Sequence, residues 1–376
     1  MLTARGAGCA GLVIVLYVGG VLLGYEELLV PATAALVALF LGLGWVLRRP
    51  SLTVRREVEP DRVTRGTPAF GVLDLRNAGR VASAPALAVE PCGDERVIVD
   101  VPRLPVGSTV TRRYRLPTER RCVLDVGPVE IVVQDPLGLW RTDQRAGDAR
   151  RVWVHPVVHP MLGLPAGRTR SMEGESADRV PHGNQTFHAL REYVIGDDLR
   201  LVHWRSFART GTLMVREHVD TSVPEVTVLV DDRARAHSAD SFEEAMECAA
   251  SIVVAATSAG HPVRMVATSG RAVSVRGGAG QARGLLDCLA ELYLGDGELR
   301  PVIARLSLER GSDTLVVVTG DAASEDLRVI GSLARRYDDA ILVSVGAEPL
   351  RVGGMSTLSG STAGEVVSRW NRAFGR

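Results

Sequence analysis

The segment Arg191–His218 combines charged residues, aromatic residues and turn residues more densely than any other part of the chain. Bidentate contacts between arginine and carboxylate groups often fix a structural element in place. We therefore expect a structural network of ion pairs in this segment, and the alternative is a surface that binds an acidic partner. The charged residues concerned are Arg200, Arg205, Arg209 and Arg216 with Glu192, Asp197, Asp198 and Glu217. The candidate signature or interaction residues are Arg191, Tyr193, Gly196, Asp197, Asp198, Arg200, His203, Trp204, Arg209, Arg216 and Glu217.

A short helix followed by a strand is predicted within this segment. Gly196 and Asp197 have the character of a turn and a helix N-cap, because an Asp oxygen accepts from backbone N–H groups two or three residues further on. The helix would then cover residues 199–210 and end at Gly211. Residues 213–215 alternate as a strand does.

His203 is the residue here that could act as a general base, with Asp197 or Asp198 to orient it. Such a site would make the chain a hydrolase, and this is the alternative function. Ser206 is the nearest hydroxyl, but the sequence has no G-x-S-x-G elbow. The two interpretations differ in whether His203 faces an open cleft beside a carboxylate or lies closed under Trp204.

Two motifs in the chain carry a family resemblance. The first is R-x-Y-x-x-G-D-D-x-R-x-x-H-W, followed by A-R-T-G-x-L-x-V-R-E. The second is Val126-Gly127-Pro128 followed by D-P-L-G-L at residues 135–139, with Leu137 in place of Phe. Over residues 120–347 the chain resembles the bacterial domain of unknown function 58 family. The resemblance implies a membrane hairpin, a β-rich module and a von Willebrand factor A-like domain. It also implies a MoxR-type AAA ATPase and a transglutaminase-like protein as partners, and no enzymatic activity.

Two uncharged apolar runs, residues 7–24 and 28–47, lie within the first 50 residues. At about 1.5 Å per residue, each helix would approach the roughly 30 Å thickness of a bilayer core. Residues 1–50 are therefore predicted to form a transmembrane hairpin in contact with the lipid bilayer. A cleaved signal peptide is the alternative, but the second apolar run follows at once.

Arginines flank this hairpin at both of its ends. The positive-inside rule then places both termini and the soluble body in the cytoplasm, with the chain as a multi-pass protein of the cell membrane. The arginines in question are Arg5 before the first run and Arg48, Arg49, Arg55 and Arg56 after the second.

Composition excludes several classes of enzyme and partner. All 44 basic residues are Arg, and the chain contains no Lys. A P-loop, a protein kinase and a pyridoxal-phosphate enzyme each need a lysine. The formal net charge is zero, which gives no reason to expect nucleic-acid binding. We therefore expect no nucleic-acid partner and no cofactor.

The cysteines and histidines do not form a metal-binding pattern. The five cysteines have no C-x-x-C spacing, which is typical of free thiols in a reducing compartment. His155 and His159 are flanked by prolines, so an extended chain would hold them about 13 Å apart. No structural zinc site is expected.

Two soluble domains follow the hairpin. Residues 51–160 alternate in short runs separated by Pro, Gly and Asn, which predicts an all-β immunoglobulin-like sandwich. Residues 161–223 are interpreted as a linker plus the Arg191–His218 segment. In residues 224–350, apolar strands alternate with helix-length segments, which predicts an open and mostly parallel α/β sheet with helices on both faces. Residues 351–376 are taken as a C-terminal tail.

The resemblance also implies a metal site at the end of the first strand of the α/β domain. Von Willebrand factor A domains usually carry D-x-S-x-S there and bind Mg²⁺ with a Thr and an Asp from other loops. Here the residues are Asp231, Asp232, Arg233, Ala234 and Arg235, with Asp321 as the distal acid. Because arginines replace the hydroxyls, we expect a degenerate site without metal. The crevice at the switch point of the sheet remains the default ligand site.

The sequence therefore favours a non-catalytic, membrane-tethered scaffold or adaptor. Through the resemblance alone, this function is connected with a MoxR-type AAA ATPase in envelope or stress physiology.

Overall fold

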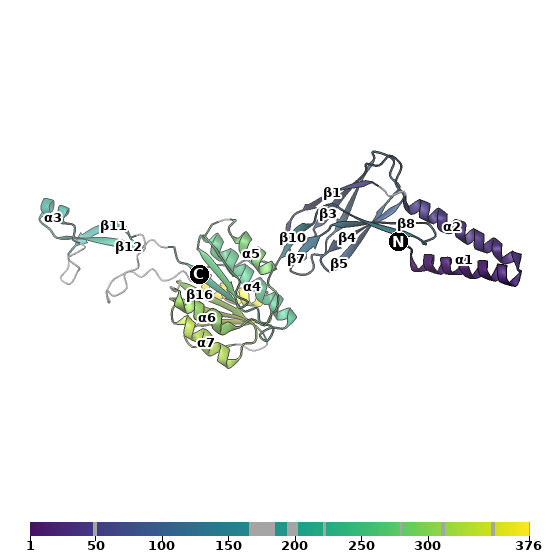
Figure 1. The fold of residues 1–376 in the computed structure, drawn as a ribbon. Coiled ribbons are helices and arrows are strands. Elements are labelled where there is room, and N and C mark those ends of the chain that lie inside the picture. Colours follow the sequence, from purple (N-terminus) through teal and green to yellow (C-terminus); the bar gives the residue numbers. More distant parts are fainter. Residues whose placement is uncertain are drawn as a thin grey trace. The chain divides into compact units, whose positions relative to one another are not determined.

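The computed structural model describes residues 1–47, 51–164, 185–193, 202–220, 223–278, 280–309, 313–346 and 350–375. The chain divides into two compact units, one of residues 1–157 with 289–291 and one of residues 158–288 with 292–376. The described elements are two N-terminal helices and a mixed α/β body with several sheets (Figure 1).

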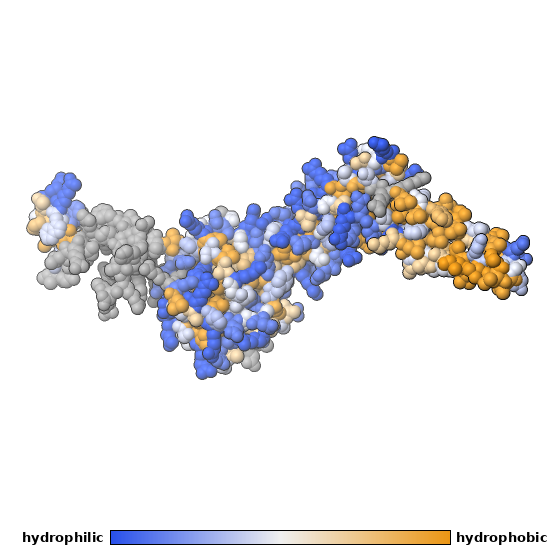
Figure 2. All heavy atoms as spheres, in the orientation of Figure 1, coloured by the Kyte–Doolittle hydropathy of each residue, from blue (hydrophilic) through white to orange (hydrophobic). Residues whose placement is uncertain are grey.

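The N-terminal helices are α1, Ala4–Leu23, and α2, Leu29–Leu47, joined through the short 3-10 helix η1, Glu26–Leu28. Thr3 begins α1, because its side chain accepts a hydrogen bond from the Gly6 N–H at 3.0 Å. Both helices are long and apolar enough to cross a membrane. Their side chains are mostly exposed, and Figure 2 shows apolar residues gathered over both helices.

Ten strands follow in two sheets. The first sheet contains β1, β3 and β6 in antiparallel pairs, and the second contains seven strands. The all-β prediction for this region is confirmed. The bounds are Leu52–Glu59 for β1, Arg62–Thr64 for β2, Phe70–Asn77 for β3, Ala86–Cys92 for β4, Glu95–Val101 for β5, Thr109–Arg115 for β6, Cys122–Val126 for β7, Val129–Gln134 for β8, Arg141–Ala146 for β9 and Arg150–His155 for β10.

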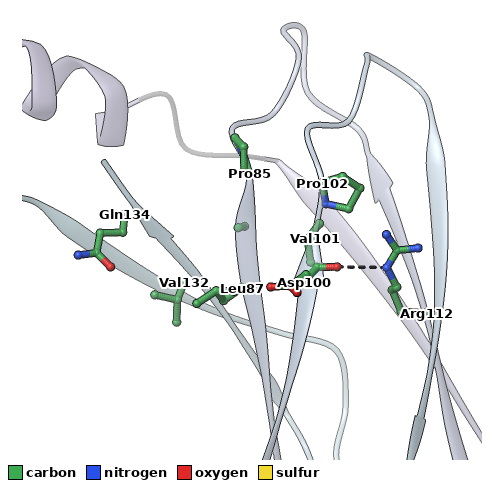
Figure 3. Close-up of a pocket in the computed structure, with 9 residues that line it drawn as sticks. Pro85, Leu87, Asp100, Val101, Pro102, Arg112, Val132 and Gln134 are labelled. Carbon is green, nitrogen blue, oxygen red and sulfur yellow. Dashed lines mark hydrogen bonds between the residues drawn. The ribbon is translucent and has the colours of Figure 1, made fainter. Parts of the chain in front are cut away.

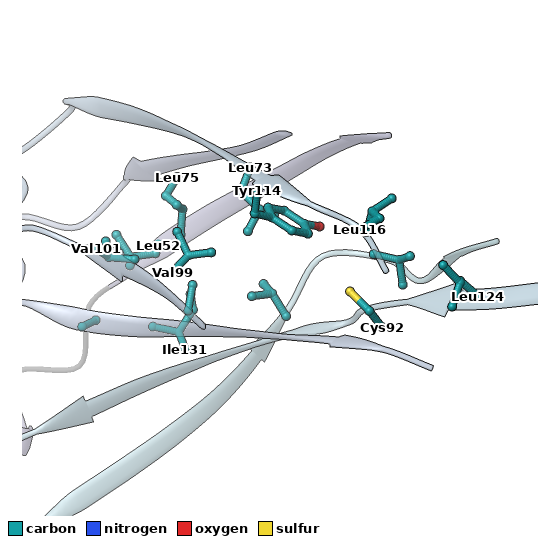
Figure 4. Close-up of a cluster of buried hydrophobic side chains, with 14 of the residues drawn as sticks. Leu52, Leu73, Leu75, Cys92, Val99, Val101, Tyr114, Leu116, Leu124 and Ile131 are labelled. Carbon is teal, nitrogen blue, oxygen red and sulfur yellow. The ribbon is translucent and has the colours of Figure 1, made fainter. Parts of the chain in front are cut away.

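One apolar core is shared by these two sheets. Successive residues of a strand point to opposite faces, so the alternation predicted from the sequence places every second residue in the core. Leu73 and Tyr114 enter the core from the first sheet, and Val99 and Ile131 enter it from the second (Figure 4). We call this two-sheet unit the β-domain.

A charged pair is buried within this β-domain. Arg56 on β1 lies 2.5 Å from Glu90 on β4, and their side chains are 2% and 0% exposed. Burial raises the pKa of Glu90 to about 7, which the charge of Arg56 opposes. A side chain at Gly127, which has φ +84°, would meet the Arg56 guanidinium. The Gly in Val126-Gly127-Pro128 therefore leaves room for the buried arginine.

The second unit includes a two-stranded antiparallel sheet of β11, Gln185–Glu192, and β12, Met214–Asp220, with the helix α3, Trp204–Thr210, between them in sequence. The strand predicted at 213–215 is thus found from Met214, and it extends to Asp220. The linker predicted from residue 161 reaches only to Gln185, and residues 185–192 form β11, which was not predicted. Its sequence QTFHALRE has no strict alternation, so the pairing with β12 decides the structure.

A six-stranded sheet forms the α/β domain, in the order β15-β14-β13-β16-β17-β18. All adjacent pairs are parallel except β14 with β15. The strands are β13, Val226–Val230; β14, Val263–Ala267; β15, Ala272–Val275; β16, Thr314–Thr319; β17, Asp339–Val345; and β18, Ser356–Gly360. The helices are α4, Ala239–Ser258; α5, Ala282–Ala290; α6, Leu299–Leu308; α7, Ser324–Ala334; and α8, Ala363–Phe374.

Helices cover both faces of this sheet, as expected. Leu229 and Val317 pack with α6 and α7 in one apolar cluster. Helix α4 contacts β13, β14, β16 and β17, and it also packs against α8. Ser238 begins α4 with a capping box in which the partner is Ser241.

The prediction of a tail at residues 351–376 is wrong. Residues 356–360 form β18, which pairs with β17, and α8 buries Val366, Val367 and Trp370. The Trp370 indole donates to the carbonyl of Gly163 at 2.9 Å. These few apolar residues stand among polar ones, and β18 has the weak strand sequence STLSG. Packing on the sheet therefore determines these elements.

Candidate functional site

The carboxyl edge of the six-stranded sheet brings together the acids predicted at the end of β13. Asp231 follows β13 directly, and its N–H donates to the carbonyl of Val318 on β16 at 2.9 Å. The N–H of Asp232 donates to the Thr268 hydroxyl at 3.0 Å. Parallel strands end at the same edge, so residues distant in sequence meet here.

Arg233 lies across this edge and joins two acids. Its Nε atom lies 2.7 Å from Asp231 Oδ1, and its Nη2 atom lies 2.7 Å from Asp231 Oδ2. Its Nη1 atom donates to Asp326 on α7 at 3.0 Å. The side chains of Arg233 and Asp231 are each 1% exposed. This is a planar, bidentate and charge-assisted contact, and lysine could not reproduce it.

Threonines at the ends of neighbouring strands complete the hydrogen bonding. The Thr319 hydroxyl, at the end of β16, donates to Asp231 Oδ2 at 2.8 Å. The Thr268 hydroxyl donates to Asp232 Oδ1, which also accepts from the Ser269 N–H at 2.8 Å. Asp326, Thr268 and Thr319 were not predicted. The signal for the threonines is their position directly after the apolar runs MVA and LVVV.

Charge and burial act in opposite directions at this edge. Burial opposes ionisation of Asp231, but the hydrogen bonds and charge of Arg233 outweigh it and lower the pKa of Asp231. Burial also lowers the pKa of His237, against the pull of Asp231 in the other direction. His237 packs edge-on against Phe242, with ring centroids 5.6 Å apart. The edge therefore holds an ionised pair with an uncharged imidazole nearby.

The residues at this edge do not fit a divalent cation. Arg233 takes both oxygens of Asp231, so a metal there would face the guanidinium. Asp321, the predicted distal acid, is exposed, and its N–H donates to the carbonyl of Ala236 at 2.8 Å. Arg235 is also exposed, 4.0 Å from Asp326. Within the described ranges, the structure groups no three His, Cys, Asp or Glu side chains that could hold a metal.

The Arg191–His218 segment is described only in part. Tyr193 N–H donates to the carbonyl of Leu213 at 2.8 Å, which continues the pairing of β11 with β12. Gly196, Asp197, Asp198 and Arg200 lie outside the described residues, so the ion pairs predicted for them are not tested. The backbones of three further residues pair within the two strands: Arg191 with Val215, Arg216 with Leu190, and Glu217 with Ala189.

The predicted helix begins later than expected. Val202 forms a β-bridge with Val215, and His203 N–H donates to the carbonyl of Met214 at 2.7 Å. The backbone of Val202 and His203 therefore pairs with β12 and is not helical, so α3 begins at Trp204. Its end is as predicted, because Gly211 has φ +73° and donates to the carbonyl of Phe207.

Helix α3 presents two aromatic rings and two arginines to solvent. Trp204 is 61% exposed and Phe207 is 39% exposed, and their rings meet edge-on with centroids 6.3 Å apart. Arg205 and Arg209 are exposed beside them. We call Trp204, Arg205, Phe207 and Arg209 the α3 surface.

His203 lies at the start of α3 and is half-buried. Its Nδ1 atom lies 2.8 Å from the Ser206 hydroxyl, while Ser206 N–H donates to the His203 carbonyl at 2.9 Å. His203 occupies the N-cap position of α3, but its side chain makes no capping hydrogen bond to the backbone and contacts the Ser206 side chain instead. The carboxylates proposed to orient His203 lie outside the described residues.

The β-domain has a cavity of about 380 Å³ that the sequence did not predict. Leu87, Val101 and Val132 line it, and Asp100 and Arg112 stand at one side (Figure 3). Arg112 Nε donates to the carbonyl of Asp100 at 3.1 Å.

Comparison with protein families supports the resemblance noted in the sequence. Residues 189–365 match the family described as "Protein of unknown function DUF58". This range contains the Arg191–His218 segment and most of the α/β domain. No curated protein matches the chain.

Solved structures resemble parts of the chain at low identity. The CARDB domain of the PF1109 protein from Pyrococcus furiosus is 14% identical, with 28% of this chain and 94% of that chain covered and a TM-score of 0.23. A β-glucosidase from Listeria innocua is 10% identical, with 28% and 17% covered and a TM-score of 0.18. Cwp6 from Clostridium difficile is 6% identical, with 85% and 56% covered and a TM-score of 0.20.

Proposed function

We propose that this relative of the DUF58 family is a non-catalytic, membrane-tethered scaffold or adaptor. In this proposal α1 and α2 span the cell membrane, and both termini and the soluble body lie in the cytoplasm. The β-domain is an immunoglobulin-like sandwich, and the α/β domain is von Willebrand factor A-like with a degenerate metal site. The partners are a MoxR-type AAA ATPase and a transglutaminase-like protein, in envelope or stress physiology.

The α3 surface is the observation that carries this proposal. Trp and Arg are enriched among the residues that dominate binding energy in protein interfaces. A Trp that is 61% exposed leaves a large apolar area in water, and burial against a partner would remove that cost. Arg205 and Arg209 would favour an acidic partner surface.

The carboxyl edge of the α/β sheet supports a role without catalysis. Open α/β sheets usually bind ligands in the crevice at this edge. Here the buried Arg233 side chain lies in that place and is held by Asp231 and Asp326. A guanidinium held in place by two carboxylates keeps its proton, so Arg233 is suited to a structural role and not to proton transfer.

Co-purification tests the proposal directly. Full-length chain is solubilised from membranes in detergent and mixed with the purified MoxR-type ATPase of the same genome. We expect capture by the unmodified chain and its loss in Trp204→Ala and Arg209→Ala. The matched control is Leu308→Ala, because Leu308 is 89% exposed on α6, outside the α3 surface. Equal capture by all variants, or none by the unmodified chain, contradicts the proposal.

A hydrolase is the second candidate function. One observation favours it, namely the 2.8 Å contact between His203 Nδ1 and the Ser206 hydroxyl. A reactive serine would be labelled by a fluorophosphonate probe, and Ser206→Ala and His203→Ala would both abolish the label. A purely structural contact between His203 and Ser206 predicts no labelling of the unmodified chain.

A further inference from the structure

The turn Asp135–Trp140, between β8 and β9, is built tightly around one carboxylate. Asp135 is 4% exposed, and its side chain accepts from Leu137 N–H at 3.0 Å and from Trp140 N–H at 2.5 Å. Gly138 N–H donates to the Asp135 carbonyl at 2.9 Å. The turn therefore has a fixed shape, and Leu137 stands at its tip, 59% exposed.

This turn packs on the N-terminal helices and is hydrogen-bonded to them. The Trp140 indole Nε1 donates to the carbonyl of Leu39 on α2 at 2.9 Å. Thr3 N–H, before α1, donates to the carbonyl of Leu139 at 3.0 Å. A glycine on each helix permits this close contact. A side chain at Gly6 would clash with Leu139, and one at Gly42 would come within 3.0 Å of Trp140.

The position of Leu39 along α2 determines how deep the turn lies relative to the bilayer. Leu39 lies about 12 Å before the end of α2, at about 1.5 Å per residue. If the turn stayed outside the bilayer, α2 would have only about 15 Å from Leu29 to Leu39 to cross a core of roughly 30 Å. A spanning α2 therefore carries the turn into the boundary of the bilayer.

The side chains of the turn suit that position. Trp is favoured at membrane interfaces, where its ring lies among apolar groups and its N–H finds a partner. Many backbone groups of the turn are hydrogen-bonded within the turn or to Thr3, which lowers the cost of placing the turn among lipids. Exposed apolar side chains stand on the turn, before α1 and on α2, since Leu137 is 59% exposed, Leu2 is 41% exposed and Leu41 is 71% exposed.

We propose that the Asp135–Trp140 turn is a third membrane-contacting element, which inserts Leu137 among the lipids beside the helical hairpin. It fixes the membrane-proximal end of the β-domain in the bilayer surface. The occupant of this surface is lipid, because the turn is continuous with the apolar faces of α1 and α2. This inference rests on the proposed membrane insertion of the hairpin.

Photocrosslinking to lipid separates the two claims. Full-length chain with benzoylphenylalanine in place of Leu137 is reconstituted in phosphatidylcholine and phosphatidylglycerol vesicles that contain a trace of alkyne-tagged phosphatidylcholine. The positive control carries the probe at Val15, which is 68% exposed within α1. The negative control carries it at Asp94, an exposed residue in the turn after the far end of β4.

We expect lipid adducts at position 137 to be several-fold above those at position 94 and similar to those at position 15. Adducts at position 15 with only background at position 137 would overturn the inference and leave the hairpin in the membrane. Background at all three positions would overturn the membrane tether and the inference together.

A glycine pair provides a second test that does not alter the turn. Gly42→Val places a branched side chain against Trp140, whereas Gly44 has open space around it. We expect Gly42→Val to lower the adduct yield at position 137 several-fold, while Gly44→Val leaves it unchanged. Both variants should retain the yield at position 15. Equal yields at position 137 in the two variants would contradict the proposed packing of the turn on α2.

Discussion

Arg233 and Asp231, two residues apart in sequence, form a planar fork in which each carboxylate oxygen accepts one guanidinium N–H at 2.7 Å. Both side chains are 1% exposed. Solvent therefore cannot replace either partner, and the pair determines how this edge of the sheet responds to substitution.

Arg233→Lys should destabilise the α/β domain although it keeps the charge. A lysine ammonium cannot contact both Asp231 oxygens and Asp326. Breaking a buried pair costs about 3–5 kcal/mol, whereas an exposed pair contributes about 0–1 kcal/mol. Urea unfolding of the full chain in detergent measures the loss of unfolding free energy. Hydrogen exchange in β13 and α7 shows whether the loss lies at this edge of the sheet. Arg235→Lys is the control, because Arg235 is 64% exposed. Equal stability of the two variants would show that the fork contributes little.

Magnesium should not stabilise the chain. Asp231 has both oxygens engaged by Arg233, so a cation at this carboxylate would face the guanidinium charge. A ligand that binds only the native state must raise the melting temperature. Scanning calorimetry with millimolar Mg²⁺ or Mn²⁺ should therefore give an unchanged Tm. A saturable rise that disappears in Asp231→Asn would contradict this expectation.

Stability of the β-domain should fall as pH rises from about 4.5 to about 7. Burial raises the pKa of Glu90 from 4.5 to about 7, so in this range the native state binds more protons than the unfolded state. The contribution of Glu90 is complete below pH 4.5 and is lost as pH rises through 7. Hydrogen exchange in β4 as a function of pH measures it. Glu90→Gln should flatten this dependence, and an unchanged slope would assign it to another group.

Two tryptophans should differ in their effect on stability. Trp370 on α8 is fully buried, and Trp→Ala at such a site costs about 3–5 kcal/mol. Trp204 is 61% exposed, so Trp204→Ala should change stability little while it weakens partner capture. Urea unfolding of both variants makes the comparison. If Trp370→Ala were as mild as Trp204→Ala, α8 would not be an integral part of the sheet domain.

The sequence by itself determined the elements whose signals are local. Uncharged apolar runs predict α1 and α2, and the buried runs before Asp231 and Gly320 predict β13 and β16, because burial of a whole element requires apolar residues throughout. Gly211 as the end of α3 follows from its freedom at positive φ. The arginine charge beside Asp231 was also foreseen from adjacent residues.

Only the tertiary structure decided relationships between distant residues. It joined Arg233 to Asp326, gave residues 351–376 a strand and a helix, and began α3 at Trp204 by pairing Val202 with Val215. It also placed Trp140 against Leu39. These contacts depend on packing between elements, and the spacing of residues along the chain does not encode which elements meet.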